Sequence, residues 1–338
     1  MQKDKTAGER GRRRGASYWF RLGGNVLMLA AFIFIIRRLL AMELDYRAVF
    51  VPANIPALAG IILVYALIVA VSFFPWWLLL KATAGRAMPI METVRVSTRS
   101  NLMKYIPGNV FQFIGRNELA VAQDVSHPQV AAATVGDMGV QFLSGVTIGL
   151  VFGANSLGRW LSMNMGALRW VLAALGVFIL VLAVLCIVFH KKIGEQLKAF
   201  KALLTLRNLG RAGTAYLFYC VTSLATSALY LLVMRLFGAV PLREWGFIVG
   251  VFILSWLVGY MTPGVPGGIG VRELLMTVLS AGAVDGNLIL PSMVLFRFIS
   301  VFGDVLAFAV VASVYRVRSR SKGRVADGEG GHPRSMRQ

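Results

Sequence analysis

Six apolar runs, each close to the length that crosses a lipid bilayer, constrain this sequence more than any other feature. They lie near residues 18–40, 56–80, 131–153, 168–189, 213–237 and 288–314. A helix needs about 20 apolar residues to cross the hydrocarbon core. Backbone polar groups in lipid must pair within their own segment, so each run is expected to be an α-helix. No small-residue cleavage site follows the first run, which we interpret as a retained span.

Positive charge is concentrated in the tails and in the loops between the apolar runs, and the net charge is +20. This placement fits the positive-inside rule and contact with anionic lipid headgroups, and no nucleic-acid-binding module accompanies it. We therefore predict an all-α protein of the cytoplasmic (inner) membrane with both termini in the cytoplasm. Its expected parts are a basic tail (1–17), a single membrane domain (18–315) and a basic disordered tail (316–338).

Two weaker stretches, 86–118 and 244–284, each contain a copy of one phrase. The first copy, KYIPGNVFQFIGRNEL, begins at Lys104, and the second, GYMTPGVPGGIGVREL, begins at Gly259. Counting crossings between the basic loops places both ends of 86–118 inside and both ends of 244–284 outside. The pattern predicts two re-entrant broken-helix hairpins in an inverted-topology repeat (56–153 and 213–314), with a site between them. The alternative is that both stretches cross completely, giving up to ten crossings.

Proline and glycine in each phrase are expected to stop one helix and allow another to start. The second copy predicts a new helix from near Val271, whose first N–H groups favour an anion. Arg272 adds forked donors that suit phosphate. Glu273 suits the first turn of this helix or a pair with a basic group. The predicted helix breaks are Pro107, Gly108, Pro263, Gly264 and Pro266.

Charged residues within the spans extend the predicted site, because charges at membrane depth are costly and should face the bundle interior and pair. Arg297 and Asp304 are seven residues apart and share a helix face. We predict a lipid-headgroup site without metal or cofactor, formed by Arg99, Lys104, Tyr105, Asn109, Gln112, Arg116, Glu118, Asp137, Tyr260, Gly267, Gly268, Gly270, Arg272, Glu273, Arg297 and Asp304.

A purely structural role for the paired phrase is the alternative. In that case Arg116 and Arg272 are helix-end charges paired with Glu118 or Glu273. Trp76 and Trp77, in the stretch FFPWWLLL, are expected in an interfacial aromatic belt and not at a ligand site.

The stretches NLMKYIPGNVFQFIGR and PGGIGVRELL resemble the two hallmark stretches of the lysylphosphatidylglycerol synthase transmembrane-region family, also called flippase-like membrane proteins. The resemblance covers roughly residues 20–315. It implies an inner-membrane helical bundle related to lipid translocation. In multidomain members such a bundle is thought to move an aminoacylated phospholipid between leaflets, and a separate cytosolic domain performs aminoacyl transfer. We find no such domain in this sequence and expect no synthase activity.

The main functional hypothesis is therefore a translocase for an anionic or phosphate-bearing lipid, whose headgroup is held by Arg116, Arg272, Arg297 and the two helix N-termini. Its expected partners are membrane lipids, with proteins of envelope biosynthesis as further candidates, and the oligomeric state does not follow from the sequence. One alternative is a membrane enzyme acting on a lipid-linked substrate, with Glu118, Asp124 or Glu273 as base. Another is a non-catalytic scaffold for envelope synthesis.

Overall fold

The computed structural model describes residues 51–105, 110–163, 205–262, 266–281 and 284–329, and every element in these ranges is helical. The first half contains the 3-10 helix η1 (Pro52–Asn54), α3 (Ile55–Val71), α4 (Phe73–Ala84), α5 (Ile90–Leu102), the 3-10 helix η2 (Met103–Tyr105), α6 (Phe111–Val121) and α7 (His127–Met163). The second half contains α10 (Leu206–Arg235), the 3-10 helix η4 (Leu242–Glu244), α11 (Trp245–Met261), the 3-10 helix η5 (Pro266–Gly268), α12 (Val271–Leu279) and α13 (Gly286–Glu329).

Five stretches in the described part are long and apolar enough to cross a membrane, so the chain is an all-helical membrane protein. They are Pro52–Ala84, His127–Ala154, Leu206–Arg235, Leu242–Tyr260 and Gly286–Arg318. Four of them match the spans predicted at 56–80, 131–153, 213–237 and 288–314. The spans predicted at 18–40 and 168–189 lie outside the described residues. The remaining stretch includes α11, within the weaker segment 244–284.

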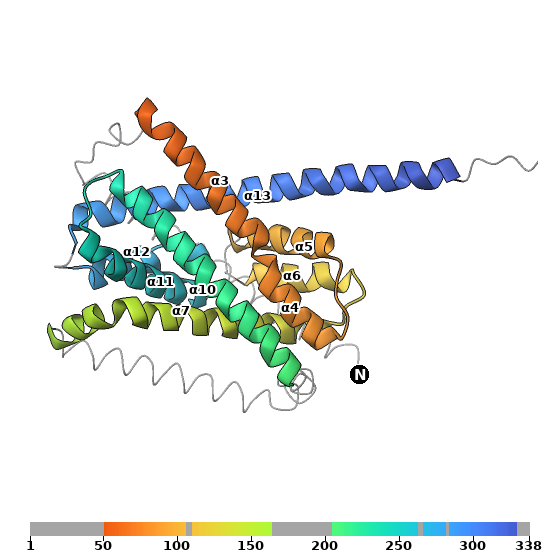
Figure 1. Cartoon of the computed structure of the whole chain (residues 1–338), viewed down its shortest axis with the longest axis horizontal. Helices are drawn as coiled ribbons and strands as arrows, with labels where there is room; N and C mark the ends of the chain where they lie inside the picture. The colour runs from red at the N-terminus through yellow and green to blue at the C-terminus, as the bar shows by residue number, and fades with distance from the viewer. Residues whose placement is uncertain (1–50, 106–109, 164–204, 263–265, 282–283, 330–338) are drawn as a thin grey trace, which may run out of the picture.

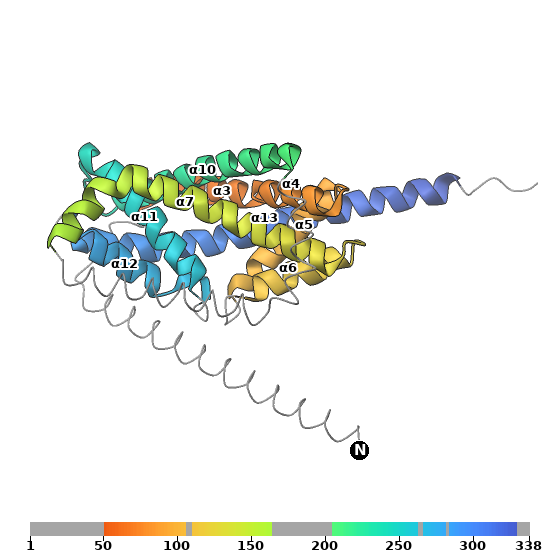
Figure 2. The same ribbon diagram turned by 90° about the horizontal axis from the view of Figure 1, so that it is seen from below.

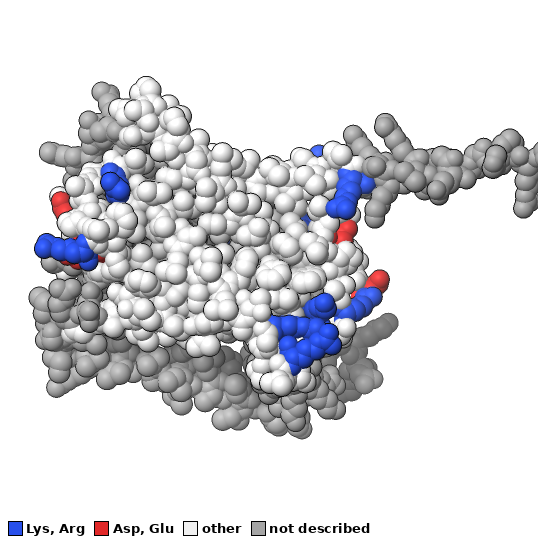
Figure 3. Space-filling view, viewed as in Figure 1, with Lys and Arg blue, Asp and Glu red and all other residues white. Residues whose placement is uncertain are grey.

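The surface in Figure 3 has a broad uncharged band, with charged side chains gathered near the two ends of the long axis. Large apolar side chains are exposed on the outer faces of α3, α10 and α13, among them Leu67, Val221 and Phe302. In water such a band would be costly, whereas in a bilayer it contacts lipid tails of matching polarity. The long axis of the molecule therefore corresponds to the membrane normal.

The two helix pairs that contain the repeated phrase, α5–α6 and α11–α12, called hairpins below for their shape alone, lie toward opposite ends of this axis. In Figures 1 and 2 the pair α5–α6 lies in the right-hand half and the pair α11–α12 in the left-hand half. Each pair is built from helices that pack against each other, and α5 also packs against α13 of the other half, as α11 packs against α7. The 3-10 turns η2 and η5 at the inner ends of α5 and α11 contact each other. Segments from both halves therefore meet inside the bundle.

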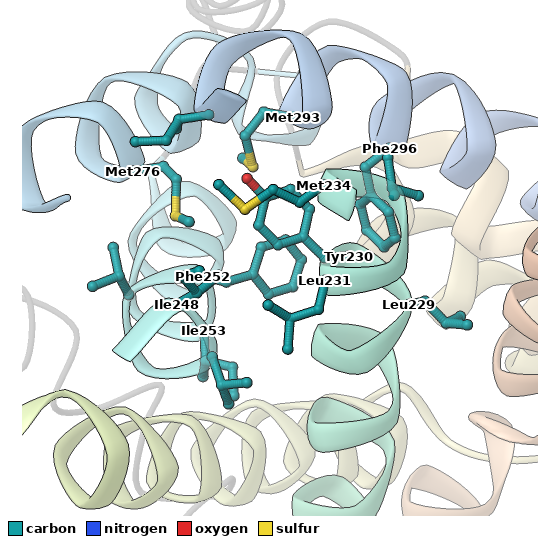
Figure 4. Packing of buried hydrophobic residues seen from close by; sticks show 14 of the residues in the cluster. Leu229, Tyr230, Leu231, Met234, Ile248, Phe252, Ile253, Met276, Met293 and Phe296 are labelled. Carbon is teal, nitrogen blue, oxygen red and sulfur yellow. The ribbon is translucent and has the colours of Figure 1, made fainter. Parts of the chain in front are cut away.

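Two hydrophobic clusters support this arrangement. The first joins α4, α5, α6 and α7 around the fully buried Trp76 and Leu79. The second lies mainly between α10, α11, α12 and α13 (Figure 4), where Tyr230 stacks on Phe252 with ring centroids 4.5 Å apart and Phe296 meets both rings edge-on. Offset and edge-to-face contacts are the favoured aromatic geometries. Each helix pair therefore contributes to a hydrophobic cluster in its own half, while α5 and α11 also pack extensively against a long helix of the other half.

Local sequence explains where the helices break. Gly267, Gly268 and Gly270 have φ values of 57°, 73° and 84°, a region that costs glycine little and other residues more. The new helix α12 begins at Val271, as predicted. The α3–α4 joint lies at Ser72, whose hydroxyl donates to the Ile68 carbonyl at 2.6 Å.

The last helix differs from the sequence-based expectation. α13 continues to Glu329, into the segment 316–338 that we expected to be disordered. Residues 316–329 contain no proline. Extending an existing helix needs no new nucleation, so polar residues can continue it beyond the apolar span.

A tight contact between α7 and α11 allows the packing of these two helices to be tested. A Cβ atom at Gly250 would lie 2.6 Å from the Gly153 backbone nitrogen, and backbone cannot swing aside. Small residues allow such contact between membrane helices. We expect Gly250→Ala to lower stability by about 1–3 kcal/mol, the usual cost of overpacking, measured as a lower melting temperature in detergent.

The matched control for this substitution is Gly139→Ala. Gly139 lies in α7, and a Cβ there meets no atom within 4 Å. The control should melt at or above the wild-type temperature, since alanine is the better helix former. Equal melting of Gly250→Ala and wild type would contradict the tight α7–α11 contact.

Candidate functional site

A cavity with a volume of about 300 Å³ lies where the two hairpins meet α3, α7, α10 and α13. This volume is at the lower end of those found for small-molecule sites. Charged and polar side chains share its wall with apolar ones such as Ile68, Phe252 and Met293. The predicted residues that line it are Lys104, Tyr105, Gln112, Arg116, Asp137, Tyr260, Gly267, Arg272, Glu273 and Arg297.

The other predicted residues have different positions. Arg99 and Glu118 are exposed and do not line the cavity. Asp304 is buried just outside the lining, and Gly268 and Gly270 form the turn before α12. Pro266 begins η5. Outside the described residues lie Pro107, Gly108, Asn109, Pro263 and Gly264.

Each hairpin is connected by one ion pair to the long helix that follows it. Arg116 of α6 lies 3.0 Å from Asp137 of α7, and Arg297 of α13 lies 3.0 Å from Glu273 of α12. Glu273 also accepts a 2.7 Å hydrogen bond from the Gly270 N–H, which caps α12. The expectation that charges within the spans face the interior and pair is thus confirmed for Asp137 and Arg297. The alternative pairing of Arg116 with Glu118 is wrong, because Asp137 takes that place.

A third ion pair connects the two halves. Lys104 Nζ lies 2.6 Å from Asp304 Oδ2 of α13. Asn101 donates to the other oxygen of Asp304 at 2.8 Å, and the Tyr105 hydroxyl donates to Oδ2 at 2.5 Å. Burial lowers the pKa of Lys104, but the Asp304 carboxylate and two neighbouring tyrosines raise it, and the net shift is upward. The inner end of the first hairpin is thereby fixed to α13.

Arg272 is the cation without an acidic partner. In the described part of the chain it forms neither an ion pair nor a hydrogen bond, and its buried Nε atom has no acceptor. Its guanidinium lies over the Trp256 ring, 5.4 Å from the centroid. Arg272 is not paired with Glu273, contrary to the structural alternative, since Arg297 occupies that carboxylate. The two undescribed segments within the repeated phrases, 106–109 and 263–265, contain no Asp or Glu that could pair with Arg272.

Two glycines make room for the Arg272 side chain. A Cβ at Gly259 would lie 2.5 Å from Arg272 Cγ, and one at Gly268 would lie 2.7 Å from Arg272 Nε. The arginine therefore passes between α11 and η5 on its way to the cavity. Burial, followed by the charge of Arg297, lowers the pKa of Arg272 to about 10, which still leaves it charged at neutral pH.

Several lining residues were missed by sequence reasoning. Tyr219, Thr222, Ser223 and Thr226 form a polar stripe on the cavity side of α10, and Gln141 lies one turn after Asp137 on α7. Their spacing of three and four residues inside an apolar span is a signal that could have identified them.

The position of Trp76 differs from the prediction that it lies in an interfacial aromatic belt. It is fully buried, with the Arg116 guanidinium 5.2 Å from its ring centroid and its Nε1 donating to Thr134 at 3.2 Å. The interfacial-belt prediction is therefore wrong for Trp76. Its position in the hydrophobic run did not reveal that α4 turns this face toward α6 and α7.

No protein-family model and no curated protein matches this sequence. The resemblance to the flippase-like family therefore stays a prediction. The cavity, its three ion pairs and its unpaired arginine are the observations on which a functional assignment can rest.

The Lys104–Asp304 pair gives a direct test of the site's construction. Removing one partner of a buried ion pair commonly costs about 3–5 kcal/mol, because the other charge remains without compensation. We expect Asp304→Asn and Lys104→Met each to lower stability strongly in detergent, and the double variant to lose less than their sum.

An exposed pair provides the control for this double-mutant cycle. The side chain of Arg243, paired with Glu244, is 83% exposed, so Glu244→Gln should change stability by no more than about 1 kcal/mol. Strict additivity of the Lys104 and Asp304 substitutions would show that the two charges do not interact as described.

Proposed function

We propose that the protein is a lipid translocase that holds the headgroup of an anionic or phosphate-bearing lipid in this cavity. The observation that carries the proposal is the unpaired Arg272. Within the described ranges, four cationic side chains, Lys104, Arg116, Arg272 and Arg297, meet three acids, Asp137, Glu273 and Asp304. A buried charge is costly unless paired, so the site favours a ligand that brings one negative charge.

The cavity wall also suits an amphipathic ligand. Arginine and lysine gather near the hairpin ends, while Ile68, Val69 and Phe252 provide apolar surface on the same wall. When a lipid headgroup lies at Arg272, the adjoining apolar atoms of the lipid can therefore contact apolar side chains of the cavity wall. This combination supports a lipid over a small soluble anion.

The order of helices supports a transport mechanism. Each half has a membrane-length segment, a pair of helices joined by a break and a long helix: α3–α4, α5, α6, α7 and then α10, α11, α12, α13. Of the paired helices, α11 belongs to a stretch that is itself long enough to cross a membrane. We infer that the two pairs are re-entrant hairpins of an inverted repeat, because they lie toward opposite ends of the molecule (Figure 2) and meet at η2 and η5. Rocking of one half against the other would expose the cavity alternately to each side.

Basic residues support an orientation. Lys81, Arg86, Arg211 and Arg318 belong to helix ends on the side where α4 ends and α10 begins, whereas the opposite end carries Arg243 beside Glu244. The positive-inside rule favours the first of these ends as cytoplasmic.

The rival enzyme hypothesis has less support. Of its three candidate bases, Glu118 and Asp124 are exposed and outside the cavity lining, and Glu273 is bound by Arg297 and the Gly270 N–H. A general base needs an oxygen within hydrogen-bond reach of the proton it takes, and at Glu273 Oε1 the Arg297 guanidinium, 3.0 Å away, competes for that position. We therefore favour translocation.

Substituting Arg272 tests the proposal. The purified full chain would be reconstituted in phosphatidylcholine vesicles containing a trace of acyl-labelled fluorescent phosphatidylglycerol, and leaflet exchange would be followed by quenching of the outer leaflet. Loss of one charge-assisted contact is worth about 1.5–3 kcal/mol, so Arg272→Gln should slow exchange roughly 10-fold or more. The exposed Arg243→Gln should exchange at the wild-type rate. Equal rates for wild type and Arg272→Gln would remove Arg272 from the site.

Gly259→Ala tests the position of the arginine without removing its charge. The added methyl group would overlap Arg272 Cγ and displace the side chain. We expect exchange to fall toward the Arg272→Gln rate. Gly246→Ala on the same helix adds only an ordinary 3.5 Å contact with Phe152 and is the control. Full exchange in Gly259→Ala would show that the guanidinium need not pass between α11 and η5.

A further inference from the structure

We propose that the cavity selects a lipid whose headgroup carries a single negative charge, no ammonium group and free hydroxyl groups, such as a polyol or sugar phosphodiester. This inference rests on the proposed function and specifies its substrate class. It excludes zwitterionic and aminoacylated lipids as preferred ligands, and thus differs from what the resemblance of the sequence implies.

The first argument is that the carboxylates near the cavity are already occupied. Asp137 accepts from Arg116 and from the Tyr219 hydroxyl, one on each oxygen. Glu273 accepts a hydrogen bond from the Gly270 N–H at Oε2, and its Oε1 forms an ion pair with Arg297 at 3.0 Å without accepting a hydrogen bond. The two oxygens of Asp304 accept from three donors. A headgroup ammonium would find each of these three carboxylates already within 3.0 Å of a cationic side chain.

The second argument is the remaining charge. With three ion pairs formed, Arg272 leaves the site with one uncompensated positive charge. A phosphodiester carries one negative charge and would neutralise it, and the forked guanidinium suits two phosphate oxygens. An added ammonium would restore the excess of positive charge in a site with little water, where it is costly.

The third argument concerns the neutral part of the headgroup. The hydroxyl groups of Thr222 and Thr226 on α10 donate to carbonyls of their own helix, at 3.0 and 2.8 Å. Ser72 and Ser300 on other walls do the same, at 2.6 and 2.7 Å. Their protons are engaged, so these oxygens offer lone pairs to the cavity. Ligand hydroxyl groups are the matching donors.

The test compares lipids that differ only in the headgroup. Acyl-labelled phosphatidylglycerol, phosphatidylethanolamine, lysyl-phosphatidylglycerol and phosphatidic acid would be assayed in the same vesicles. We expect phosphatidylglycerol to exchange at least about tenfold faster than the two amine-bearing lipids, a difference comparable to one charge-assisted contact. Phosphatidic acid, whose phosphate carries no polyol and can bear a second negative charge, should be slower than phosphatidylglycerol.

A binding measurement separates this inference from the transport proposal. Short-chain phosphatidylglycerol should raise the melting temperature of the detergent-purified protein more than short-chain phosphatidylethanolamine, since a ligand stabilises the state it binds. Selective stabilisation without any exchange would support the charge inference and overturn the translocase proposal. Exchange that needs Arg272 but treats amine-bearing lipids equally would overturn the charge inference alone. Equal stabilisation by the deacylated headgroup would support the charge inference and indicate a soluble anion in place of a lipid.

Substitution of Gln141 is expected to change which lipid headgroup the protein prefers. It lines the cavity one turn from Asp137, and within the described part of the chain its backbone carbonyl accepts from Ser144 while its side-chain amide makes no hydrogen bond. Gln141→Glu would supply a free carboxylate, and should raise phosphatidylethanolamine exchange relative to phosphatidylglycerol by about tenfold. Gln141→Met, of similar size and neutral, should leave the wild-type order. An unchanged headgroup order in Gln141→Glu, with the protein folded and active, would overturn the inference.

Discussion

The Asp304 carboxylate holds together parts of the chain that are 203 residues apart, because Asn101, Lys104 and Tyr105 all donate to it. A carboxylate in apolar surroundings needs such donors, and the inner end of a broken helix needs anchoring. One interaction meets both needs. It fixes η2 against α13, and η2 in turn contacts η5 of the second hairpin. The cavity exists because these two turns meet at a defined position.

Periodicity and helix-breaking residues made the helical class and the start of α12 predictable from sequence. The paired phrase also led to the correct neighbourhood, because charged residues at membrane depth can be stable only in the interior. Ion-pair partners were harder to predict. Arg116 and Glu118 are two residues apart and point to different sides of a helix, so tertiary contact with α7 decided the pairing.

Residues on helices far from the phrase were the ones that sequence reasoning missed. Tyr219 and the hydroxyl residues after it belong to α10, and nothing local indicates that α10 borders the hairpins. Trp76 was misassigned for a similar reason. An aromatic residue near the end of an apolar run suits an interface equally well, and only the packing of α4 against α7 makes it a buried platform for Arg116.

In both halves an ion pair joins the hairpin to the long helix that follows it, but the cation and the acid exchange places between the two halves. In the first half the hairpin supplies the cation, Arg116, and the following long helix supplies the acid, Asp137. In the second half the hairpin supplies the acid, Glu273, and the long helix supplies the cation, Arg297. Because Glu273 is engaged in this way, the neighbouring Arg272 has no acidic partner among the residues that the structure describes, although it lies over Trp256 much as Arg116 lies over Trp76. A strictly symmetric protein would pair both arginines, so the reversal in the second half is what leaves Arg272 as the cation on which the proposed anion site rests.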